Sequence, residues 1–295
     1  MIPALGLVEL AAHAVQICSI TPAGDWRAAR DYVAARAKDE DLIAFAPRWA
    51  DPLGREYFGA SLATTTREAR ADETRFLRAF EVSIRGAHLE PFAEWRHAGE
   101  EHFGSVLVTT WENPAPRIVI DDLVAHLKPP LAQVDILQGG RETGCSFGHG
   151  SAQSGPLGYG PAVPSDRFAC PSGGSVSVSV VADWEYVGRR CIYAPAPGGA
   201  ASLRIRFLGV RMGRSLEGHH TLYVEAERGR SGSPVTITFR AGETILGQAV
   251  HHDGESWKPF QFDTGALAGT QADLSAEIGA PNGERRMYCF EATTR

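Results

Sequence analysis

The spacing of apolar residues near the start of the chain predicts an amphipathic helix. Trp26, Ala29 and Val33 recur three or four positions apart within the segment 25–38, so they share one face of a helix. Asp25 stands just ahead of them, where an acidic side chain can cap the helix. We therefore expect this helix to pack one face on a core.

Strand spacing follows the helix. The apolar run at 42–46 has the length of a buried strand and is followed by a proline. Apolar and other residues then alternate at 80–84, as on a half-buried strand, and the segment 93–113 contains one or two further strands. Because helix and buried strand together begin an α/β layer, residues 21–128 are predicted to form a small α/β domain.

The pattern changes to alternation with a period of two in the second part of the chain. Short segments of this kind follow one another, separated by Gly, Pro, Ser and Asn. They lie at 175–182, 202–210, 220–227, 234–240, 244–252, 257–263, 272–278 and 286–292. Such spacing is typical of an antiparallel sandwich, so residues 131–295 are predicted to form a β-sandwich of the jelly-roll or a related kind. The chain as a whole is expected to be a two-domain α+β protein.

One stretch interrupts the alternation. Residues 139–174 contain ten glycines and four prolines. A loop of that length without its own secondary structure is uncommon in a compact domain unless it is functional or disordered. We interpret it as a glycine-rich lobe of the sandwich domain.

Composition and charge narrow the class of protein. The chain has 295 residues, of which 43% are apolar and 22% charged, and this excludes collagen-like, disordered and multi-span membrane proteins. A net charge of -6 argues against a surface that coats nucleic acid. Residues 1–130 carry 19 acidic and 14 basic side chains, for a net charge of -5. Residues 131–295 carry 16 acidic and 15 basic side chains, for a net charge of -1. This difference supports a domain boundary near Pro129-Pro130.

The number and spacing of the cysteines indicate the cellular compartment in which the protein folds. The second domain contains four cysteines, Cys145, Cys170, Cys191 and Cys289, and the first part of the chain contains Cys18. None of the four is arranged as a C-x-x-C pair, so two disulfides are favoured over a zinc site. Three connectivities are open. We favour Cys145 with Cys170, which closes the glycine-rich lobe, and Cys191 with Cys289, which joins two strands. Disulfides predict an oxidising, extracytoplasmic location, whereas four buried thiols would fit a cytosolic protein.

The N-terminal segment 2–20 is largely apolar but contains Pro3, Glu9, His13 and Gln16. No basic residue precedes it, so it lacks the charged start of a secretory signal, and its polar residues do not suit a spanning helix. Two interpretations stay open. The segment is either an amphipathic helix packed on the first domain or the remnant of a membrane anchor that tethers the protein.

The first domain contains a D-W-R helix, an acidic turn, a D-L-I-x-F strand and an aromatic-rich segment. Together they form the string GDWRAARDYVAARAKDEDLIAFAPRWADPLGREYFG at 24–59, and the strings FEVSIRG and EEHFGSVLVTTWENP follow. These features resemble the soluble extracytoplasmic region of bacterial membrane glycosyltransferases that use lipid-linked sugars, the dolichyl-phosphate-mannose mannosyltransferase type. The resemblance covers about a third of the chain.

This resemblance implies a location rather than a reaction. Members of that family carry their catalytic carboxylates in loops between membrane spans, and such spans are missing from this sequence, so none of their functional residues is carried over. The acidic pair Asp121-Asp122 lies in a predicted linker helix and is interpreted as solvated surface. The strings FACPSGG, RRCIYAP and MYCFEATTR are similar to domains of uncharacterised, singly anchored envelope proteins of GC-rich bacteria.

Ser146 stands in the motif Gly144-Cys145-Ser146-Phe147-Gly148, which matches the G-x-S-x-G of serine hydrolases. A nucleophile elbow needs a strand before the serine and a helix after it. Both flanks are glycine-rich, so we keep a hydrolase using Ser146 only as an alternative.

Clustered histidines are candidates for a metal site, and glycine-rich stretches are candidates for a nucleotide-binding site. His219-His220 and His251-His252-Asp253 cluster in sequence, but adjacent residues of a strand point to opposite faces, so each pair offers at most one ligand to a site. We favour histidines that are half-buried and hydrogen-bonded over a metal site. The sequence has no G-x-x-x-x-G-K-[ST] motif, so no nucleotide or other cofactor is predicted.

A glycan site is the chemistry that the aromatic residues favour. Sugars present flat apolar faces beside hydroxyl groups, so they bind where an aromatic platform lies next to charged side chains. Asp183, Trp184, Tyr186 and Arg189 follow one predicted strand, and Tyr159 lies in the glycine-rich lobe. We take these five as candidate ligand-binding residues, with packing of Trp184 in the core or at the rim as the alternative.

The sequence therefore predicts a non-catalytic protein of the periplasm or cell envelope that binds a glycan or a partner protein. Trp257, which opens another strand, is a second aromatic candidate. The alternatives are an accessory part of a lipid-linked-sugar glycosyltransferase system and the Ser146 hydrolase. We predict no metal, no cofactor and no nucleic-acid partner.

Overall fold

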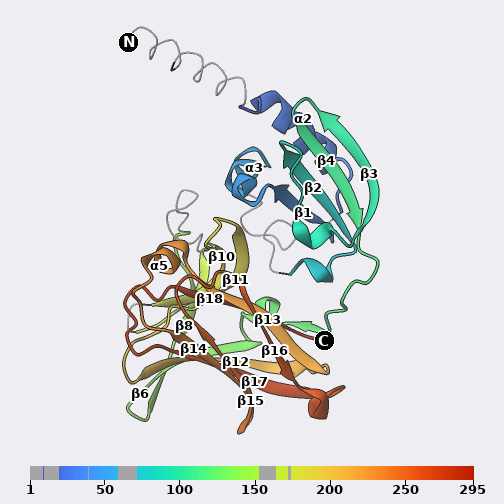
Figure 1. The fold of residues 1–295 in the computed structure, drawn as a ribbon. Coiled ribbons are helices and arrows are strands. Elements are labelled where there is room, and N and C mark those ends of the chain that lie inside the picture. Colours follow the sequence, from blue (N-terminus) through green and yellow to red (C-terminus); the bar gives the residue numbers. More distant parts are fainter. Residues whose placement is uncertain (1–8, 10–19, 39, 59–71, 153–163, 172–173) are drawn as a thin grey trace.

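A small mixed sheet with two helices precedes a larger β-sandwich (Figure 1). The computed structural model describes residues 9, 20–38, 40–58, 72–152, 164–171 and 174–295. We call residues 20–112 the first domain and residues 120–295 the sandwich. The segment that joins them begins at Asn113, whose backbone N donates a hydrogen bond to Leu77 O of the first domain.

The first domain is built on a four-stranded sheet in the order β1-β2-β4-β3. Its elements are α2 (Ala23–Ala34), β1 (Leu42–Ala46), η1 (Arg48–Ala50), α3 (Asp51–Phe58), η3 (Glu73–Arg75), β2 (Arg78–Ile84), η4 (Glu90–Phe92), β3 (Arg96–Phe103) and β4 (Val106–Glu112). Strand β1 is parallel to β2, and the other pairs are antiparallel. The assignment of this domain to the α/β class stays a prediction.

Helix α2 forms where helical spacing predicts it, and Trp26, Ala29 and Val33 are buried against the sheet. Its N-cap position is Pro22 rather than the expected Asp25. The Asp25 carboxylate instead accepts hydrogen bonds from the backbone N (2.8 Å) and Oγ (3.0 Å) of Ser105. Asp25 therefore ties the helix to the turn between β3 and β4.

The sandwich consists of two antiparallel sheets. The larger one has the order β16-β13-β18-β11-β10-β9-β8, with β5 beside β18, and the smaller one has the order β15-β14-β17-β12-β6-β7. Its elements are β5 (Asp121–Asp122), α4 (Leu123–His126), β6 (Ala132–Gln138), β7 (Arg141–Gly144), β8 (Ser146–His149), β9 (Asp166–Ala169), β10 (Ser175–Ala182), β11 (Gly188–Tyr193), β12 (Ala201–Arg211), β13 (Ser215–Leu222), α5 (Val224–Gly229), β14 (Val235–Ala241), β15 (Thr244–His251), β16 (Lys258–Asp263), η5 (Gly265–Leu267), β17 (Gln271–Gly279) and β18 (Tyr288–Thr294). The sequence prediction of antiparallel sheets is confirmed, and the jelly-roll subtype stays a prediction.

The core lies between the two sheets and follows the alternation of the strands. Phe207 and its neighbours at alternate positions of β12 point inward and are buried, whereas the arginines between them are half-exposed. The Phe239 ring lies 5.4 Å from that of Phe260 and 5.9 Å from that of Phe290, which joins the sheets across the core. Such aromatic pairs add to the free energy of burial.

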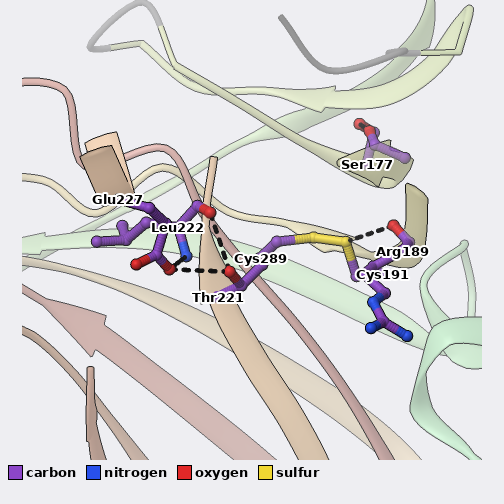
Figure 2. Close-up of a disulfide and its surroundings, with 8 residues drawn as sticks. Ser177, Arg189, Cys191, Thr221, Leu222, Glu227 and Cys289 are labelled. Carbon is purple, nitrogen blue, oxygen red and sulfur yellow. Dashed lines mark hydrogen bonds between the residues drawn. A yellow bond between two sulfur atoms is a disulfide. The ribbon is translucent and has the colours of Figure 1, made fainter. Parts of the chain in front are cut away.

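One predicted strand is partly a helix. The segment 220–227 supplies the end of β13 and then the start of α5. The Glu227 carboxylate reaches back to accept hydrogen bonds from Leu222 N (3.0 Å) and Thr221 Oγ1 (2.9 Å) (Figure 2). These bonds give the backbone N–H of Leu222 and the hydroxyl of Thr221 an acceptor at the end of β13, and they hold α5 against that strand.

Both expected disulfides are present. Cys145 pairs with Cys170 and Cys191 pairs with Cys289, across 25 and 98 residues of chain. The second bridge joins β11 to β18 (Figure 2). The first lies in the glycine-rich lobe, which contains β8 and β9 as well as residues 153–163 outside the described part. Two disulfides are typical of a protein in an oxidising compartment.

The sandwich begins earlier than the predicted boundary at Pro129-Pro130. Leu123, Val124 and Leu127 already belong to its core, and β5 already pairs with β18. The acidic pair of β5 is therefore not the solvated linker surface that we expected. Asp121 accepts hydrogen bonds from Arg211 N (2.9 Å) and contacts His126, and Asp122 caps α4.

No helix within the described ranges is long and apolar enough to cross a membrane. The segment 2–20 falls almost entirely outside the described residues, as does Cys18. Both interpretations of that segment stay predictions.

Candidate functional site

The first domain is held against the outer face of the larger sandwich sheet. At the contact, Arg55 donates hydrogen bonds to Asp51 (2.7 Å) and to Gly188 O (3.2 Å), and Gly188 N donates to Asp51 (3.2 Å). All three residues are buried. A Cβ at position 188 would lie 2.5 Å from the Arg55 guanidinium carbon, so a larger residue there would displace the guanidinium group.

A second contact between the domains involves Asp72, which forms an ion pair with Arg295 and accepts hydrogen bonds from Thr74 N (2.9 Å) and Oγ1 (2.7 Å). Burial alone would raise the pKa of Asp72. The charge of Arg295 and the hydrogen bonds from Thr74 outweigh burial and hold this pKa below its ordinary value. Asp72 is therefore ionised at neutral pH.

Two hollows lie in the cleft between the domains. One has a volume of about 370 Å³, and we call it the Glu217 hollow. It is lined by Asp72, Thr74, Arg117, Glu217, Gly218, His219, Pro259, Phe260, Gln261, Glu291, Thr293 and Arg295. The other, of about 340 Å³, we call the Trp257 hollow. It is lined by Arg48, Glu73, Pro91, Trp184, Glu185, Arg189, His219, Ser256 and Trp257.

The residue shared by the two hollows is His219. Its Nδ1 lies 2.8 Å from Glu291 Oε1, and its ring stacks on that of Trp257 at 5.4 Å with an interplanar angle of 8°. Strand register accounts for Glu291, because His219 of β13 lies opposite Glu291 of β18. On the other side His219 lies opposite Pro259 of β16, and Trp257 directly precedes that strand. These contacts fix the imidazole at the point where the hollows meet.

Glu291 lies beneath His219 and is almost completely buried. Burial raises the pKa of Glu291, the hydrogen bond and charge of His219 lower it, and the charges of Asp72 and Asp122 raise it further. The net direction is upward. Glu291 is therefore a weaker acid than Asp72, which lines the same hollow.

The lining of each hollow includes an ion pair with a partly exposed arginine. In the Glu217 hollow, Arg117 of the linking segment donates to Glu217 Oε1 at 2.6 Å. In the Trp257 hollow, Arg48 of η1 donates to Glu185 Oε2 at 2.6 Å. Both arginines keep 40% or more of their side chains exposed, so a bound molecule can reach them.

The turn after β10 carries three of the residues expected from the sequence. Asp183 is buried, and its two oxygens accept hydrogen bonds from Glu185 N (2.9 Å), Val187 N (3.0 Å) and Arg189 Nε (2.8 Å). An aspartate at the start of a turn commonly binds the backbone in this way. Asp183 therefore shapes the turn that carries Trp184 and does not face the cleft.

Trp184 and Arg189 line the Trp257 hollow. Burial alone would lower the pKa of Arg189, but Asp183, Glu73 and Asp51 outweigh it and hold this pKa above its ordinary value, so the side chain stays charged. The guanidinium carbon lies 5.4 Å from the centre of the Trp257 ring.

Tyr186 lies beside the cleft lining rather than in it. Arg228 of α5 is placed over the Tyr186 ring at 4.3 Å and over the Trp184 ring at 5.8 Å. Arg230 is 5.1 Å from the Trp184 ring. Tyr159, the fifth candidate, lies outside the described residues. The structure thus brings Trp184 and Arg189 together and gives Tyr186 a supporting position.

The sequence did not single out Glu217, Glu291, Asp72 or Arg117. A signal existed for one pair, because residues at alternate positions of a strand share a face, and Glu217 and His219 are so spaced in β13. Their meeting with residues of the first domain depends on how the domains pack, which alternation does not encode.

Ser146 lacks the surroundings of a nucleophile elbow. It begins β8, an exposed strand, and β7 ends just before it at Gly144. A strand therefore follows the serine where the elbow needs a helix. The hydrolase alternative has no support from this geometry.

The side chains of His219, His220 and His251 are hydrogen-bonded within the protein. His220 Nδ1 lies 2.7 Å from the Tyr288 hydroxyl, and His251 Nε2 lies 2.6 Å from Glu227. His252 is exposed, and Asp253 pairs with Arg286. In the described part of the chain, no three His, Cys, Asp or Glu side chains are placed to share a metal ion.

Another hollow, of about 490 Å³, lies on the outer face of the smaller sheet. Arg204, Arg206 and Arg240 line it together with Glu277, and Arg206 pairs with Asp135 at 2.7 Å. Among the residues that the structure describes, its lining contains no aromatic side chain. The cleft between the domains therefore has the better chemistry for binding a sugar.

No protein-family model and no curated protein matches the chain. Among solved structures, the xylan-binding module CBM15 matches at 9% identity and a TM-score of 0.27, over 60% of this chain and 95% of that one. A second match is the structure of CBM51-2 in complex with GlcNAc and INT domains from Clostridium perfringens ZmpB. It has 6% identity and a TM-score of 0.25, and the match covers 50% of this chain and only 40% of that one. A cyclase from Fischerella sp. TAU matches at 12% identity and a TM-score of 0.25, over 56% of this chain and 85% of that one. Likeness at this level carries no argument about function.

Proposed function

We propose that this protein is a non-catalytic, extracytoplasmic glycan-binding protein and that the sugar binds in the cleft between the first domain and the sandwich. The observation that carries the proposal is the meeting of Trp184 and Trp257 with the Arg48–Glu185 ion pair in one hollow, next to a second hollow of similar size. Small-molecule sites commonly combine concave shape, aromatic lining and a few fixed polar groups.

The chemistry of this lining suits a sugar. An indole ring can cover the apolar C–H face of a pyranose, while carboxylate and guanidinium groups at its edge bond to the hydroxyl groups. Glu185 follows Trp184 directly on the turn that Asp183 holds, so platform and hydrogen-bonding group are fixed together. A fixed site loses less conformational entropy on binding.

The disulfides support a location in the periplasm or cell envelope, where such bonds form and persist. An accessory role in transfer of lipid-linked sugars stays a prediction from the resemblance of the first domain. The same holds for a tether through residues 2–20.

Calorimetric titration with a panel of envelope and plant oligosaccharides tests the proposal. We expect one of them to bind the native protein, and Trp184→Ala and Trp257→Ala to weaken that binding at least tenfold. Trp49→Ala is the matched control, because Trp49 is exposed but lines neither hollow. Absence of binding by every oligosaccharide, or equal loss in all three variants, would contradict the proposal.

A further inference from the structure

We infer that the cleft takes a neutral oligosaccharide of at least two sugar units, laid across His219. The inference rests on the proposed function and names the class of glycan. Three observations carry it: the division of the cleft into two hollows, the position of His219 between them, and the pairing of the charged groups in the lining.

The size of the hollows sets the number of sugar units. They measure about 370 and 340 Å³, and each is near the lower end of the roughly 300–1,000 Å³ typical of small-molecule sites. The Trp257 hollow supplies indole rings, and the Glu217 hollow supplies the carboxylate of Glu217 and the guanidinium group of Arg117. A monosaccharide would use the contacts of one hollow only, so affinity should rise steeply when a second unit is added.

His219 is placed to bind where the two units join. Glu291 occupies its Nδ1, and the stack with Trp257 fixes the ring plane. Among the described residues, no hydrogen bond reaches Nε2, and about a quarter of the side chain (26%) is exposed. The Nε2 atom can therefore bond to a hydroxyl or ring oxygen next to the glycosidic linkage.

The charges of the lining favour a neutral ligand. Arg48 and Arg117 each contact a carboxylate at 2.6 Å, Arg189 contacts Asp183 at 2.8 Å, and Arg295 pairs with Asp72. A uronate or sulfate that took Arg48 would remove the ion pair of Glu185, and one that took Arg117 would leave Glu217 with only the more distant Arg295 (3.8 Å) as an ion-pair partner. In both cases a second negative charge would lie beside the glutamate. Hydroxyl groups can bond to both members of a pair without separating them, so they avoid that cost.

The experiment compares chain length and charge in calorimetric titrations of the full chain. The neutral probes are glucose, xylose and N-acetylglucosamine, each with its β-1,4-linked dimer and tetramer. The charged probes are digalacturonate and tetragalacturonate. In the neutral series that binds, we expect the dimer to bind at least tenfold more tightly than the monomer, and galacturonates of equal length to bind at least tenfold more weakly.

Variants assign the second unit to the Glu217 hollow. We expect Arg117→Gln to reduce the ratio of dimer to monomer affinity to less than threefold, and Arg141→Gln, an exposed arginine of β7, to leave that ratio as in the native protein. A monomer that binds within threefold of the dimer overturns the inference but not the proposed function, and so does tighter binding of galacturonates. Failure of every series to bind overturns both.

Discussion

His220 and His251 meet inside the sandwich with their rings 4.8 Å apart, and each makes a hydrogen bond to a different buried partner. Burial of His220, with smaller effects from the charges of His251 and Lys258, lowers its pKa to about 3. The ring is therefore neutral in the folded protein at every pH above that value. In the unfolded chain, the same imidazole titrates near its ordinary pKa of about 6.5.

This difference predicts how stability depends on pH. Because the folded pKa is lowered, the contribution of His220 is complete above pH 6.5 and is lost as pH falls from 6.5 toward 3. In urea unfolding, the free energy should fall by up to about 1.4 kcal/mol per pH unit through this residue. We expect His220→Gln to show a shallower pH dependence by that amount. Equal slopes for variant and native protein would contradict the assignment.

Asp183 is a second residue whose burial can be tested. It holds the turn before β11 and pairs with the buried Arg189, so Asp183→Ala leaves that cation without its main partner. We expect a loss of about 3–5 kcal/mol in the free energy of unfolding. Asp166→Ala, which removes a carboxylate from an exposed pair with His149, should cost under about 1 kcal/mol. Similar losses in the two variants would show that the turn tolerates the change.

At the scale of elements, alternation of polar and apolar residues was enough to find most strands of the sandwich. It failed where other interactions decide the local structure. The segment 220–227 alternates like a strand, but the hydrogen bonds of Glu227 to Thr221 and Leu222 favour a helix after residue 222. Strands β7 to β9 lie in the glycine-rich lobe and are too short for a period of two to be recognised.

The disulfides also act at this scale, because each links two elements. In the chain-entropy account, a bridge across 98 residues stabilises by about 4.7 kcal/mol and one across 25 residues by about 3.5 kcal/mol. Replacing Cys191 and Cys289 by serine should therefore lower stability more than replacing Cys145 and Cys170, as measured by urea unfolding without reductant. The reverse order would contradict this account.

Thiol titration of the unfolded, unreduced chain checks the pairing itself. The sequence contains five cysteines, and two bridges leave only Cys18 to react. We expect one reactive thiol per chain. Five would show that neither bridge forms and would remove the argument for an oxidising compartment.

At the scale of the whole molecule, the site depends on contacts that link distant parts of the sequence. Asp72 and Arg295 are 223 positions apart, and Arg117 and Glu217 are 100 positions apart. Sequence patterns specify which face of a strand a residue occupies but not which domain covers that face. This is why the sequence identified Trp184 and Arg189 but not the cleft.

Arg55 tests whether the two domains behave as one unit. Arg55→Met removes its hydrogen bond to Gly188 O and leaves Asp51 with one fewer partner in the contact between domains. We expect the native protein to unfold in one transition by calorimetry, and the variant to unfold in two and to bind glycan at least tenfold more weakly. One transition at an unchanged temperature would show that this contact does not couple the domains.

The most direct test of the glycan-binding cleft is an NMR titration that follows the indole N–H signals of all six tryptophans while the tightest-binding neutral oligosaccharide is added. Trp184 and Trp257 line the cleft, and Trp26, Trp49, Trp95 and Trp111 do not. We predict that the signals of Trp184 and Trp257 shift and that the other four stay in place. Shifts confined to the other four would place the sugar elsewhere and contradict this account.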